Sequence, residues 1–424
     1  MNELRRQMGL FQTTIYGIGL ILGAGIYVLI GEAAGMAGDA VWISFAIGVI
    51  VAIFSGLSYA ELASLFPHAA AEYVFVKNAF KNNFLAFLVG WLTVFTSIVS
   101  AAAVALGFGG YFAQFFDYPI VISAAFLLVI LSVLNFIGIR ESSWTNVVFT
   151  MIEAAGLVLI IYLGFTFTGA EPVNYFESPS GPSGIFLAFV LIFFAFIGFE
   201  DIVNIAEETK NPKKVLPRAI ILSIVITGII YMLVSLSAIR VLDWQELAAS
   251  AAPLADVAGR ALGSSGQLVL SLIALFATTN TVLIILLAGS RIIYGMAVHH
   301  SLPLLLGRVH NKTKTPWVSI IAIMCVSIIF LFVENITTVA NIAVFAIAIT
   351  FALVNLSVII LRYREPNLER SFKIPINVGK FPILSALGFV TTAFMITQFD
   401  WYVLSFGIAI IGIGTLFYVI YRNS

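Results

Sequence analysis

Long apolar segments separated by short polar connectors run along the whole of this chain. An α-helix needs about 20 consecutive apolar residues to cross the hydrocarbon core of a bilayer. Measured against that length, the pattern predicts an all-α polytopic membrane protein with twelve transmembrane helices, over residues 11–36, 40–66, 84–112, 119–138, 143–168, 184–208, 215–240, 264–298, 316–333, 336–362, 380–398 and 401–421.

Glycines interrupt the first of these segments at its centre. Gly17, Gly19, Gly23 and Gly25 fall within nine residues, and each glycine in a helix interior costs roughly 1 kcal/mol relative to alanine. Unwound backbone inside a membrane is tolerated only where it is buried in protein or lines a cavity. The break therefore predicts a binding site at mid-membrane depth. A glycine face for close helix packing is the alternative interpretation.

A second interruption lies in the sixth segment, in the run FFAFIGFED at 193–201. Five segments separate the two breaks, and this odd spacing inverts the second unit relative to the first. Broken helices at equivalent places of inverted halves are typical of inverted-repeat transporters. We therefore expect a 5+5 inverted repeat, with 1–168 and 169–363 as the repeats and 364–424 as two further helices. A straight helix rich in aromatic residues is the alternative for the sixth segment.

Composition and charge support a membrane protein and set its orientation. The chain is 61% hydrophobic and 10% charged, with a mean hydropathy of +1.07, which excludes a soluble domain. Of its 21 Lys and Arg residues, only Arg240 and Arg260 fall in the set of connectors opposite the N-terminus. The positive-inside rule therefore predicts a plasma-membrane protein with both termini in the cytoplasm. Nothing in the pattern indicates a nucleic-acid partner.

The sequence shows no motif for catalysis or ATP hydrolysis. Walker, CxxC and HExxH patterns are absent, the single Cys325 can form no internal disulfide, and the four histidines have no ligand spacing. We therefore expect no cofactor, no resident metal and no enzymatic activity, and this chain alone is not expected to be an ATP-driven pump.

Short stretches spread over the chain are similar to signatures of known proteins. They are GLILGAGIY at 19–27, YAELASLFPHAAAEYVF at 59–75, FFAFIGFED at 193–201, EETKNPKKVLPRAI at 207–220, SRIIYGMAVHHSLP at 290–303, REP at 364–366 and FKIP at 372–375. Together they resemble one family, the amino acid–polyamine–organocation transporters. The family often has glycines at 69–71 and Asp-Gly at 299–300, where this chain has alanines and His299-His300. The resemblance implies an amino acid permease with the leucine-transporter-type fold.

Backbone groups exposed at the two breaks predict how a substrate is held. N–H groups that open the second half of helix 1 carry partial positive charge and suit a carboxylate. Carbonyl groups that end the first half of helix 6 suit an ammonium group. One zwitterion would bridge the breaks, and the resemblance implies the same, an α-amino acid held between helices 1 and 6. The substrate-binding residues that we expect are Ile21, Gly23, Ala24, Gly25, Ile26, Phe194, Ala195, Ile197, Gly198, Ile98 and Ala101.

Side chains near this site predict the substrate class. Helix 6 offers Phe196 and Phe199, and helix 3 offers Ser97, Ile98, Ser100, Ala101 and Ala102. Phe194 stands where the family often has a gating aromatic. Each aromatic residue could equally be a packing residue. We expect no carboxylate and no arginine in the pocket, and this favours neutral amino acids. A polyamine or another organocation is the alternative substrate.

Carboxylates within the predicted spans need a reason, because a charge at mid-bilayer costs several kcal/mol. Glu200 lies beside the helix 6 break, where its carboxylate can accept hydrogen bonds from the N–H groups that open the second half-helix. The resemblance implies that Glu200 and Phe199 have structural or gating roles. Glu153 lies in an apolar stretch of helix 5, where several proton-coupled relatives carry a lysine. We expect Glu153 to bind the coupling proton, with Thr279 and Asn280 of helix 8 nearby. A sodium ion near Glu153, Thr278 and Thr279, and a purely structural carboxylic acid, are the alternatives.

The sequence therefore predicts a secondary active transporter that works by alternating access, with proton-coupled uptake or exchange of neutral amino acids. A sodium-coupled amino acid symporter is the alternative within this class. A channel or an amino acid receptor is the alternative from a different class.

Overall fold

The structure is a computed structural model that describes residues 8–67, 71–138, 143–169, 172–206, 209–298, 301–333 and 335–422. Positions 68–70, 207–208 and 299–300, which belong to the family-like stretches, lie outside the described residues. The apolar helices are α1 (Leu10–Leu22), α2 (Gly25–Ala37), α3 (Val41–Leu65), α5 (Asn83–Phe112), α6 (Ile120–Ile137), α7 (Ser143–Thr166), α8 (Gly181–Ile192), α9 (Pro212–Val241), α12 (Ser264–Val298), α13 (Trp317–Leu331), α14 (Ile336–Arg364), α15 (Ile383–Thr397) and α16 (Trp401–Arg422).

Shorter elements connect these helices. They are the 3₁₀ turns η1 (Gly38–Ala40), η2 (Phe193–Phe196), η3 (Glu200–Ile205) and η4 (Leu304–Gly307), the helices α4 (Ala71–Phe80), α10 (Trp244–Ala249) and α11 (Pro253–Leu262), and the strands β1 (Asn377–Val378) and β2 (Phe381–Pro382).

A helix occupies every interval that the apolar pattern predicted. Within the described residues, nine helical stretches are long and apolar enough to cross a membrane, and α1, α13 and α15 are shorter apolar helices. The predicted all-helical, membrane-type architecture is therefore confirmed, while a count of twelve crossings stays a prediction. Local signals set several helix ends: Asn82 caps α5 by accepting from the N–H groups of Phe84 and Leu85, and Gly138 ends α6 in the left-handed conformation.

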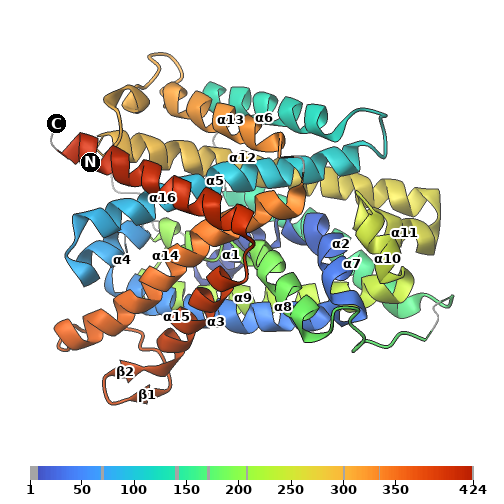
Figure 1. Cartoon of the computed structure of the whole chain (residues 1–424), viewed down its shortest axis with the longest axis horizontal. Coiled ribbons are helices and arrows are strands. Elements are labelled where there is room, and N and C mark those ends of the chain that lie inside the picture. The colour runs from blue at the N-terminus through green and yellow to red at the C-terminus, as the bar shows by residue number, and fades with distance from the viewer. Residues whose placement is uncertain are drawn as a thin grey trace.

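The helices form one elongated bundle (Figure 1), in which α3 packs along α9 and α5 packs along α12. Helices α10 and α11 cover the end of the bundle opposite α4 and the end of α16. Glycines let this cover approach closely, because a Cβ at Gly31 would lie 2.4 Å from the Leu247 carbonyl oxygen, and one at Gly110 would lie 2.2 Å from that of Ala251. The cover is thus packed directly onto α2 and α5.

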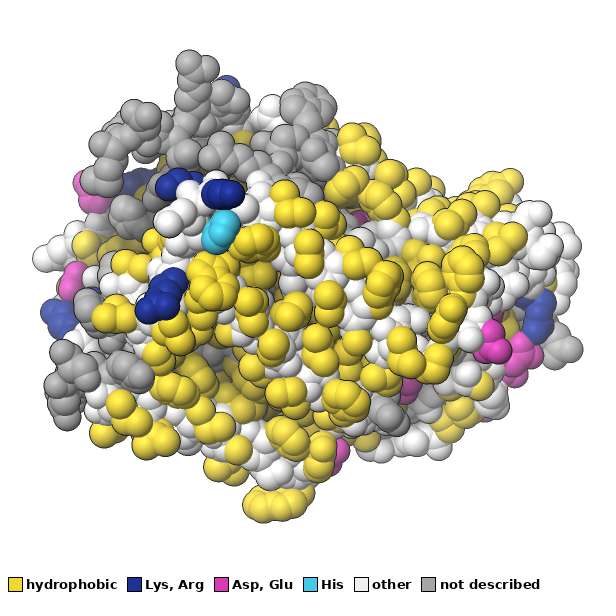
Figure 2. Space-filling view, turned by 90° about the horizontal axis from the view of Figure 1, so that it is seen from above, with side chains coloured by type: hydrophobic (Ala, Val, Ile, Leu, Met, Phe, Trp, Pro, Cys, Tyr) yellow, Lys and Arg dark blue, Asp and Glu magenta, His cyan; other side chains and the backbone are white. Residues whose placement is uncertain are grey.

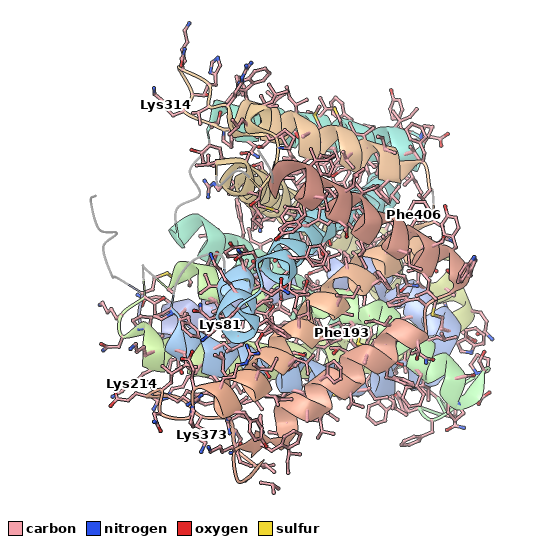
Figure 3. The ribbon with its side chains drawn as sticks, turned by 60° about the vertical axis from the view of Figure 1, so that its left-hand side comes forward. Lys81, Phe193, Lys214, Lys314, Lys373 and Phe406 are labelled. Carbon is pink, nitrogen blue, oxygen red and sulfur yellow. The ribbon has the colours of Figure 1, made fainter. Side chains whose placement is uncertain are left out.

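The surface has the apolar belt of a membrane protein. Figure 2 shows hydrophobic side chains over the middle of one face and charged side chains toward its two ends. Large apolar side chains on this surface, such as those of Phe126, Val158 and Ile408, are more than half exposed. Figure 3 shows Lys81, Lys214, Lys314 and Lys373 near one end of the bundle, the end at which α1 begins.

A buried ion cluster ties the C-terminal ends of α3 and α14 together. Glu61 and Arg362 are 1% and 3% exposed, and the carboxylate accepts from Nε (2.9 Å) and Nη2 (2.5 Å) of Arg362. Glu61 also accepts from Arg370 (3.2 Å) and from the backbone N–H of Ile374 (2.9 Å). Every oxygen of this carboxylate has a partner, which is the condition for burying a charge.

Removing Arg362 should be strongly destabilising. We expect Arg362→Gln to lower the free energy of unfolding by about 3–5 kcal/mol, because it breaks a two-point contact and leaves Glu61 buried with less compensation. The matched control is Lys81→Gln, which removes an exposed 3.8 Å pair with Glu365 and should cost less than about 1 kcal/mol. Denaturation in detergent micelles measures both, and equal small losses would contradict the assigned role of the cluster.

Candidate functional site

The first predicted break is present between α1 and α2. Helix α1 ends at Leu22, α2 begins at Gly25, and the first backbone bond of α2 runs from the Val28 N–H to the Ala24 carbonyl (3.0 Å). The N–H groups at the start of a helix have no intrahelical acceptor. Their dipoles point out of the α2 terminus, which is therefore a local site of positive potential.

The second predicted break follows α8. The chain forms one 3₁₀ turn, η2, then an extended residue at Ile197 (φ −60°, ψ 132°) and Gly198 at φ +124°. Gly198 needs to be a glycine for two reasons, since its φ is positive and a Cβ would lie 2.6 Å from the Leu20 carbonyl oxygen. The segment therefore crosses α1 at close range before η3 begins.

The two breaks lie against each other. A Cβ on Gly25 would come within 2.6 Å of the Ala195 Cα, so backbone packs on backbone here. The buried hydroxyl of Tyr231, on α9, lies 2.6 Å from the Ile21 carbonyl oxygen and 3.1 Å from that of Ala195, and donates to them. One side chain thus satisfies a freed carbonyl on each broken helix.

A cavity of about 100 Å³ opens at the breaks. It extends along residues 93–104 of α5 and 281–292 of α12, toward the side on which α5 begins and α12 ends. That side is the one on which α1 begins, so the cavity leads to the N-terminal face of the bundle. Its lining residues are Gly19, Leu20, Ile21, Gly23, Ala24, Gly25, Thr93, Thr96, Ser97, Ser100, Val104, Phe194, Ala195, Ile197, Gly198, Glu200, Asp201, Thr281, Ile284, Ile285, Ala288, Ile292 and Ile347.

Four hydroxyl side chains form the α5 wall of this cavity. Thr93 and Ser97 donate to carbonyl groups of their own helix. The hydroxyls of Thr96 and Ser100 are buried without a hydrogen-bond partner among the described residues. On the opposite wall, Thr281 Oγ1 accepts from the Ala24 N–H (3.1 Å) at the helix 1 break. The wall can therefore still bind polar groups of a ligand.

Two carboxylates line the cavity, so the expectation of a pocket without acidic groups is wrong. Glu200 and Asp201 open η3 and lie beyond the break on the N-terminal side. Glu200 Oε2 accepts from the Gly198 N–H (2.9 Å). This bond ties the carboxylate to the unwound segment directly before η3, which begins at Glu200. Capping of the second half-helix by Glu200 stays a prediction.

Most of the expected substrate-binding residues line the cavity, and three do not. Ile26 is fully buried one residue inside α2. Ile98 and Ala101 fall outside the lining positions of α5, which recur every three or four residues as one helical face. The Ile98 carbonyl instead accepts from Ser327 of α13 (2.9 Å). The expected helix is therefore correct, but Ile98 and Ala101 lie on another face of it.

The aromatic residues of the second break divide between cavity and packing. Phe194 lines the cavity. Phe196 packs against Tyr231, with ring centroids 5.4 Å apart, and Phe199 packs between Tyr59 (5.6 Å) and Phe351 (5.1 Å). The structure therefore places Phe196 and Phe199 in the core.

Glu153 lies at a contact of α7 with α2 and α12. Its side chain is fully buried, Asn280 Nδ2 donates to Oε1 (3.1 Å), and the Tyr27 hydroxyl donates to its backbone carbonyl (2.7 Å). Glu153 Oε2 and Asn280 Oδ1 have no partner among the described residues. Both unpaired atoms are oxygens, so the position has capacity for one further donor, a proton or a cation.

The threonines expected beside Glu153 are engaged within α12. The hydroxyl of Thr278 donates to the Ala274 carbonyl (2.8 Å) and that of Thr279 to the Leu275 carbonyl (2.7 Å). Thr281, also on α12, is the residue that contacts the break between α1 and α2. It was not predicted from the sequence. The sequence alone could not single out Thr281, because it does not show which face of α12 turns toward α1.

Glu72 is a second acidic residue that sequence reasoning missed. It lies on α4, is 7% exposed, and accepts from the Tyr59 hydroxyl (3.3 Å). Burial, and then the negative charge of Asp201, raise the pKa of Glu72 to about 7. The α4 connector is thereby coupled electrostatically to the N-terminal end of the cavity.

Comparison with known proteins gives a consistent match along the chain. A family model described as amino acid permease matches residues 8–420. The branched-chain amino acid permease BcaP of Bacillus subtilis (strain 168) is 30% identical over 448 residues, which cover 100% of this chain and 94% of that protein. A methylthioribose transporter of the same organism is 28% identical, with the same coverage. Cationic amino acid transporter 4 of Mus musculus is 29% identical over 391 residues, 86% of this chain and 61% of that protein.

The raised pKa of Glu72 predicts a pH dependence of stability with a definite sign. Because the pKa is about 7 in the folded chain against an ordinary value of 4.5, protonation stabilises the fold at low pH, and this stabilisation is lost as pH rises between those values. We expect the loss to be on the order of 3 kcal/mol at most, and Glu72→Gln to remove it.

Denaturation midpoints measured from about pH 4.5 to about pH 8 check this expectation. The exposed Glu369→Gln is the control and should keep the wild-type slope. Parallel curves for wild type and Glu72→Gln would show that Glu72 does not titrate in this range.

Proposed function

The chain belongs to the amino acid permease family, and we propose that it is a secondary active transporter that moves neutral amino acids across the plasma membrane by alternating access. Its relatives are transporters and permeases, so the chain is a membrane transport protein and not an enzyme. The observation that carries the finer proposal is the pair of helix breaks, which lie in contact and open on one cavity.

The breaks supply complementary groups for a zwitterion. The N–H groups that open α2 have no acceptor in their own helix and suit the substrate carboxylate, while the Ala24 N–H before them already donates to Thr281. Carbonyl groups around the second break suit the ammonium group; Ala195 and Ile21 already accept from Tyr231, but each carbonyl oxygen has a second lone pair. In this proposal Gly23 and Phe194 lie beside the substrate, and Gly25 serves to hold the two breaks together.

The walls of the cavity favour a substrate with an uncharged side chain. Ile284, Ile285 and Ile347 provide apolar surface, and the unpaired hydroxyls of Thr96 and Ser100 provide hydrogen-bonding capacity. A buried polar group without a partner costs about 1–3 kcal/mol, so a small polar substituent or a water held by the substrate would be stabilised here. The 30% identity to a branched-chain amino acid permease agrees with a neutral substrate.

A cationic amino acid is the second candidate substrate. Asp201 and Glu200 line the N-terminal end of the cavity, where they could attract a positively charged side chain. The similarity to cationic amino acid transporter 4 favours the same class. We rank it second because Glu200 already accepts from Gly198 and both carboxylates lie beyond the breaks.

Glu153 is the residue that we assign to ion coupling. It is buried where α7 meets α2 and α12. An ionised carboxylate with one oxygen unpaired among the described residues is costly there. A proton on Oε2 could donate to the unpaired Oδ1 of Asn280 and complete the local bonding. A sodium ion held by the same oxygens is the alternative, with Thr278 and Thr279 offering further lone pairs.

Helix pairing supports the inverted repeat. The second, third and fourth segments (α3, α5, α6) pack on the seventh, eighth and ninth (α9, α12, α13), as expected when residues 1–168 and 169–363 are related by a pseudo-twofold axis. The lysines gathered at the end of the bundle where α1 begins support cytoplasmic termini. With this orientation, Glu200 and Asp201 line the cytoplasmic end of the cavity.

Uptake by proteoliposomes tests the proposal and separates it from a channel or a receptor. A secondary transporter concentrates substrate when an ion gradient is imposed, a channel only equilibrates it, and a receptor binds without uptake. Two results would overturn the proposal. One is that no imposed ion gradient drives accumulation of substrate. The other is that a folded protein, shown to be so by cooperative unfolding, takes up no amino acid.

We predict that Glu153→Gln keeps substrate binding and exchange but loses pH-driven accumulation. Glutamine retains the shape and hydrogen bonding of the protonated acid but cannot release a proton. The control is Asp117→Asn, on an exposed connector, which should behave as wild type. Uptake that follows sodium and ignores pH would make Glu153 an ion ligand, and normal pH-driven accumulation by the Gln variant would make it structural.

A competition panel decides the substrate class. We predict that neutral amino acids inhibit uptake and that arginine, lysine and glutamate do not. Asp201→Asn should then leave the apparent affinity for neutral substrates nearly unchanged. If arginine or lysine inhibits and Asp201→Asn weakens that inhibition by roughly tenfold or more, the loss expected for one bond to a charged group, the cationic candidate is correct.

A further inference from the structure

The connector between α14 and α15 contains a hairpin that the transport proposal does not use. Strand β1 pairs antiparallel with β2, and Gly379 turns between them at φ +61°. Figure 1 shows the hairpin projecting sideways from the bundle beside the start of α15. It lies at the N-terminal end of the bundle, because α14 ends beside the end of α3, where Arg362 pairs with Glu61.

The hairpin exposes apolar side chains next to lysines. Ile376 is 61% exposed, Val378 68% and Phe381 37%. Residues 373–382 also carry Lys373 and Lys380, both exposed, and no carboxylate. Exposed apolar residues flanked by Lys or Arg are typical of segments that lie in the interface of a membrane.

The hairpin is held in place by the buried ion cluster. Glu61 accepts from the Ile374 N–H (2.9 Å) at its base, and Arg362 donates to the side chain of Asn377 in β1. The Asn377 amide in turn donates to the Ile374 carbonyl (2.6 Å). Ile376 stands at φ +60°, which is unfavourable for a β-branched residue and persists only when its surroundings impose it. The apolar tip is therefore presented in a fixed direction.

The hairpin continues the lipid-facing surface of a short helix. Helix α15 has 15 residues, a length of about 22 Å at 1.5 Å per residue, against about 30 Å for the hydrocarbon core. Its exposed apolar residues include Leu387, Val390 and Phe394. The hairpin precedes α15 directly, and its strand β1 contacts that helix. Val378 and Phe381 of the hairpin are likewise exposed.

We propose that residues 373–382 form a membrane-surface contact that binds anionic phospholipids. Val378 and Phe381 insert at the level where acyl chains meet headgroups, and Lys373 and Lys380 contact lipid phosphates. Lysines near an anionic leaflet are attracted by its negative surface potential. Continuity with the lipid-facing side of α15 and the absence of a carboxylate in the segment favour a lipid surface over a protein partner.

The single cysteine of the chain makes a direct test possible. In a Cys325→Ala background, Val378→Cys carries a nitroxide label, and the labelled protein is reconstituted in symmetric vesicles of neutral lipid or of neutral plus anionic lipid. Collision of the label with oxygen and with a water-soluble nickel chelate reports its depth. We expect oxygen to be favoured at residue 378, and the label to move deeper when anionic lipid is present.

The connector between α12 and α13 supplies two controls, one for the label and one for the removal of two lysines. A label at Lys312→Cys, exposed near the same end of the bundle, should stay accessible to nickel in both vesicles. The double variant Lys373→Gln/Lys380→Gln should abolish the lipid-dependent shift at residue 378. The double variant Lys312→Gln/Lys314→Gln should keep it, since it removes the same charge elsewhere.

Three outcomes would overturn the proposal. One is a label at residue 378 that nickel reaches in both vesicles, which places the hairpin in water. Another is a label that neither reagent reaches and that broadens through a second label, which indicates contact with another copy. The third is a lipid-dependent shift that survives removal of Lys373 and Lys380, which excludes the lysines as the lipid-binding groups.

Discussion

Backbone groups that leave a helix inside a membrane need partners within the protein, and this constraint determines how the centre of the molecule is built. Breaking α1 and the sixth segment at the same depth lets each break serve the other. Gly25 and Gly198 permit direct contact between the two broken segments, and the Tyr231 hydroxyl lies within hydrogen-bond distance of a carbonyl from each. Within the described part of the chain, the hydroxyls of Thr96 and Ser100 are left without a partner, and the N–H groups that open α2 have no acceptor in their own helix. The binding capacity of the site is thus what is left after the breaks have satisfied each other.

The same constraint explains why buried carboxylates differ from one another. Glu61 has a donor for each oxygen from two arginines and a backbone N–H, and it acts as a fixed structural charge. Glu153 has one amide donor and one unpaired oxygen, which leaves room for a proton or an ion. Glu72 shares its surroundings with Asp201 and has a pKa near neutrality. The number of donors around each carboxylate therefore separates a structural role from an exchangeable one.

The sequence predicted those features for which its composition allows only one stable structure in a membrane. It did not predict which face of each helix points into the cavity. The glycine cluster at 17–25 located the first break and apolar lengths located the long apolar helices, since few structures satisfy backbone groups in lipid. Which face of a helix meets the cavity depends on packing against distant segments. For that reason Ile98 and Ala101 were expected to bind substrate although Thr96 lines the wall, and the contact of Thr281 with Ala24 was not expected. Asp201 was overlooked because the break redirects the chain after Gly198 and brings η3 to the cavity.

Contacts around the cavity indicate which parts can move relative to each other. Helix α1 and η3 form one unit on the N-terminal side: a Cβ at Gly17 would meet Ile202 at 2.4 Å, and the Lys210 N–H donates to the Met8 carbonyl (2.9 Å). Ser223 of α9 joins this unit by donating to the Thr14 carbonyl (3.0 Å). Helices α5 and α12 pack on each other and form the opposite wall. The bond from Ala24 to Thr281 spans the two walls at the break, so any closing or opening of the cavity that shifts one wall past the other must change this contact first.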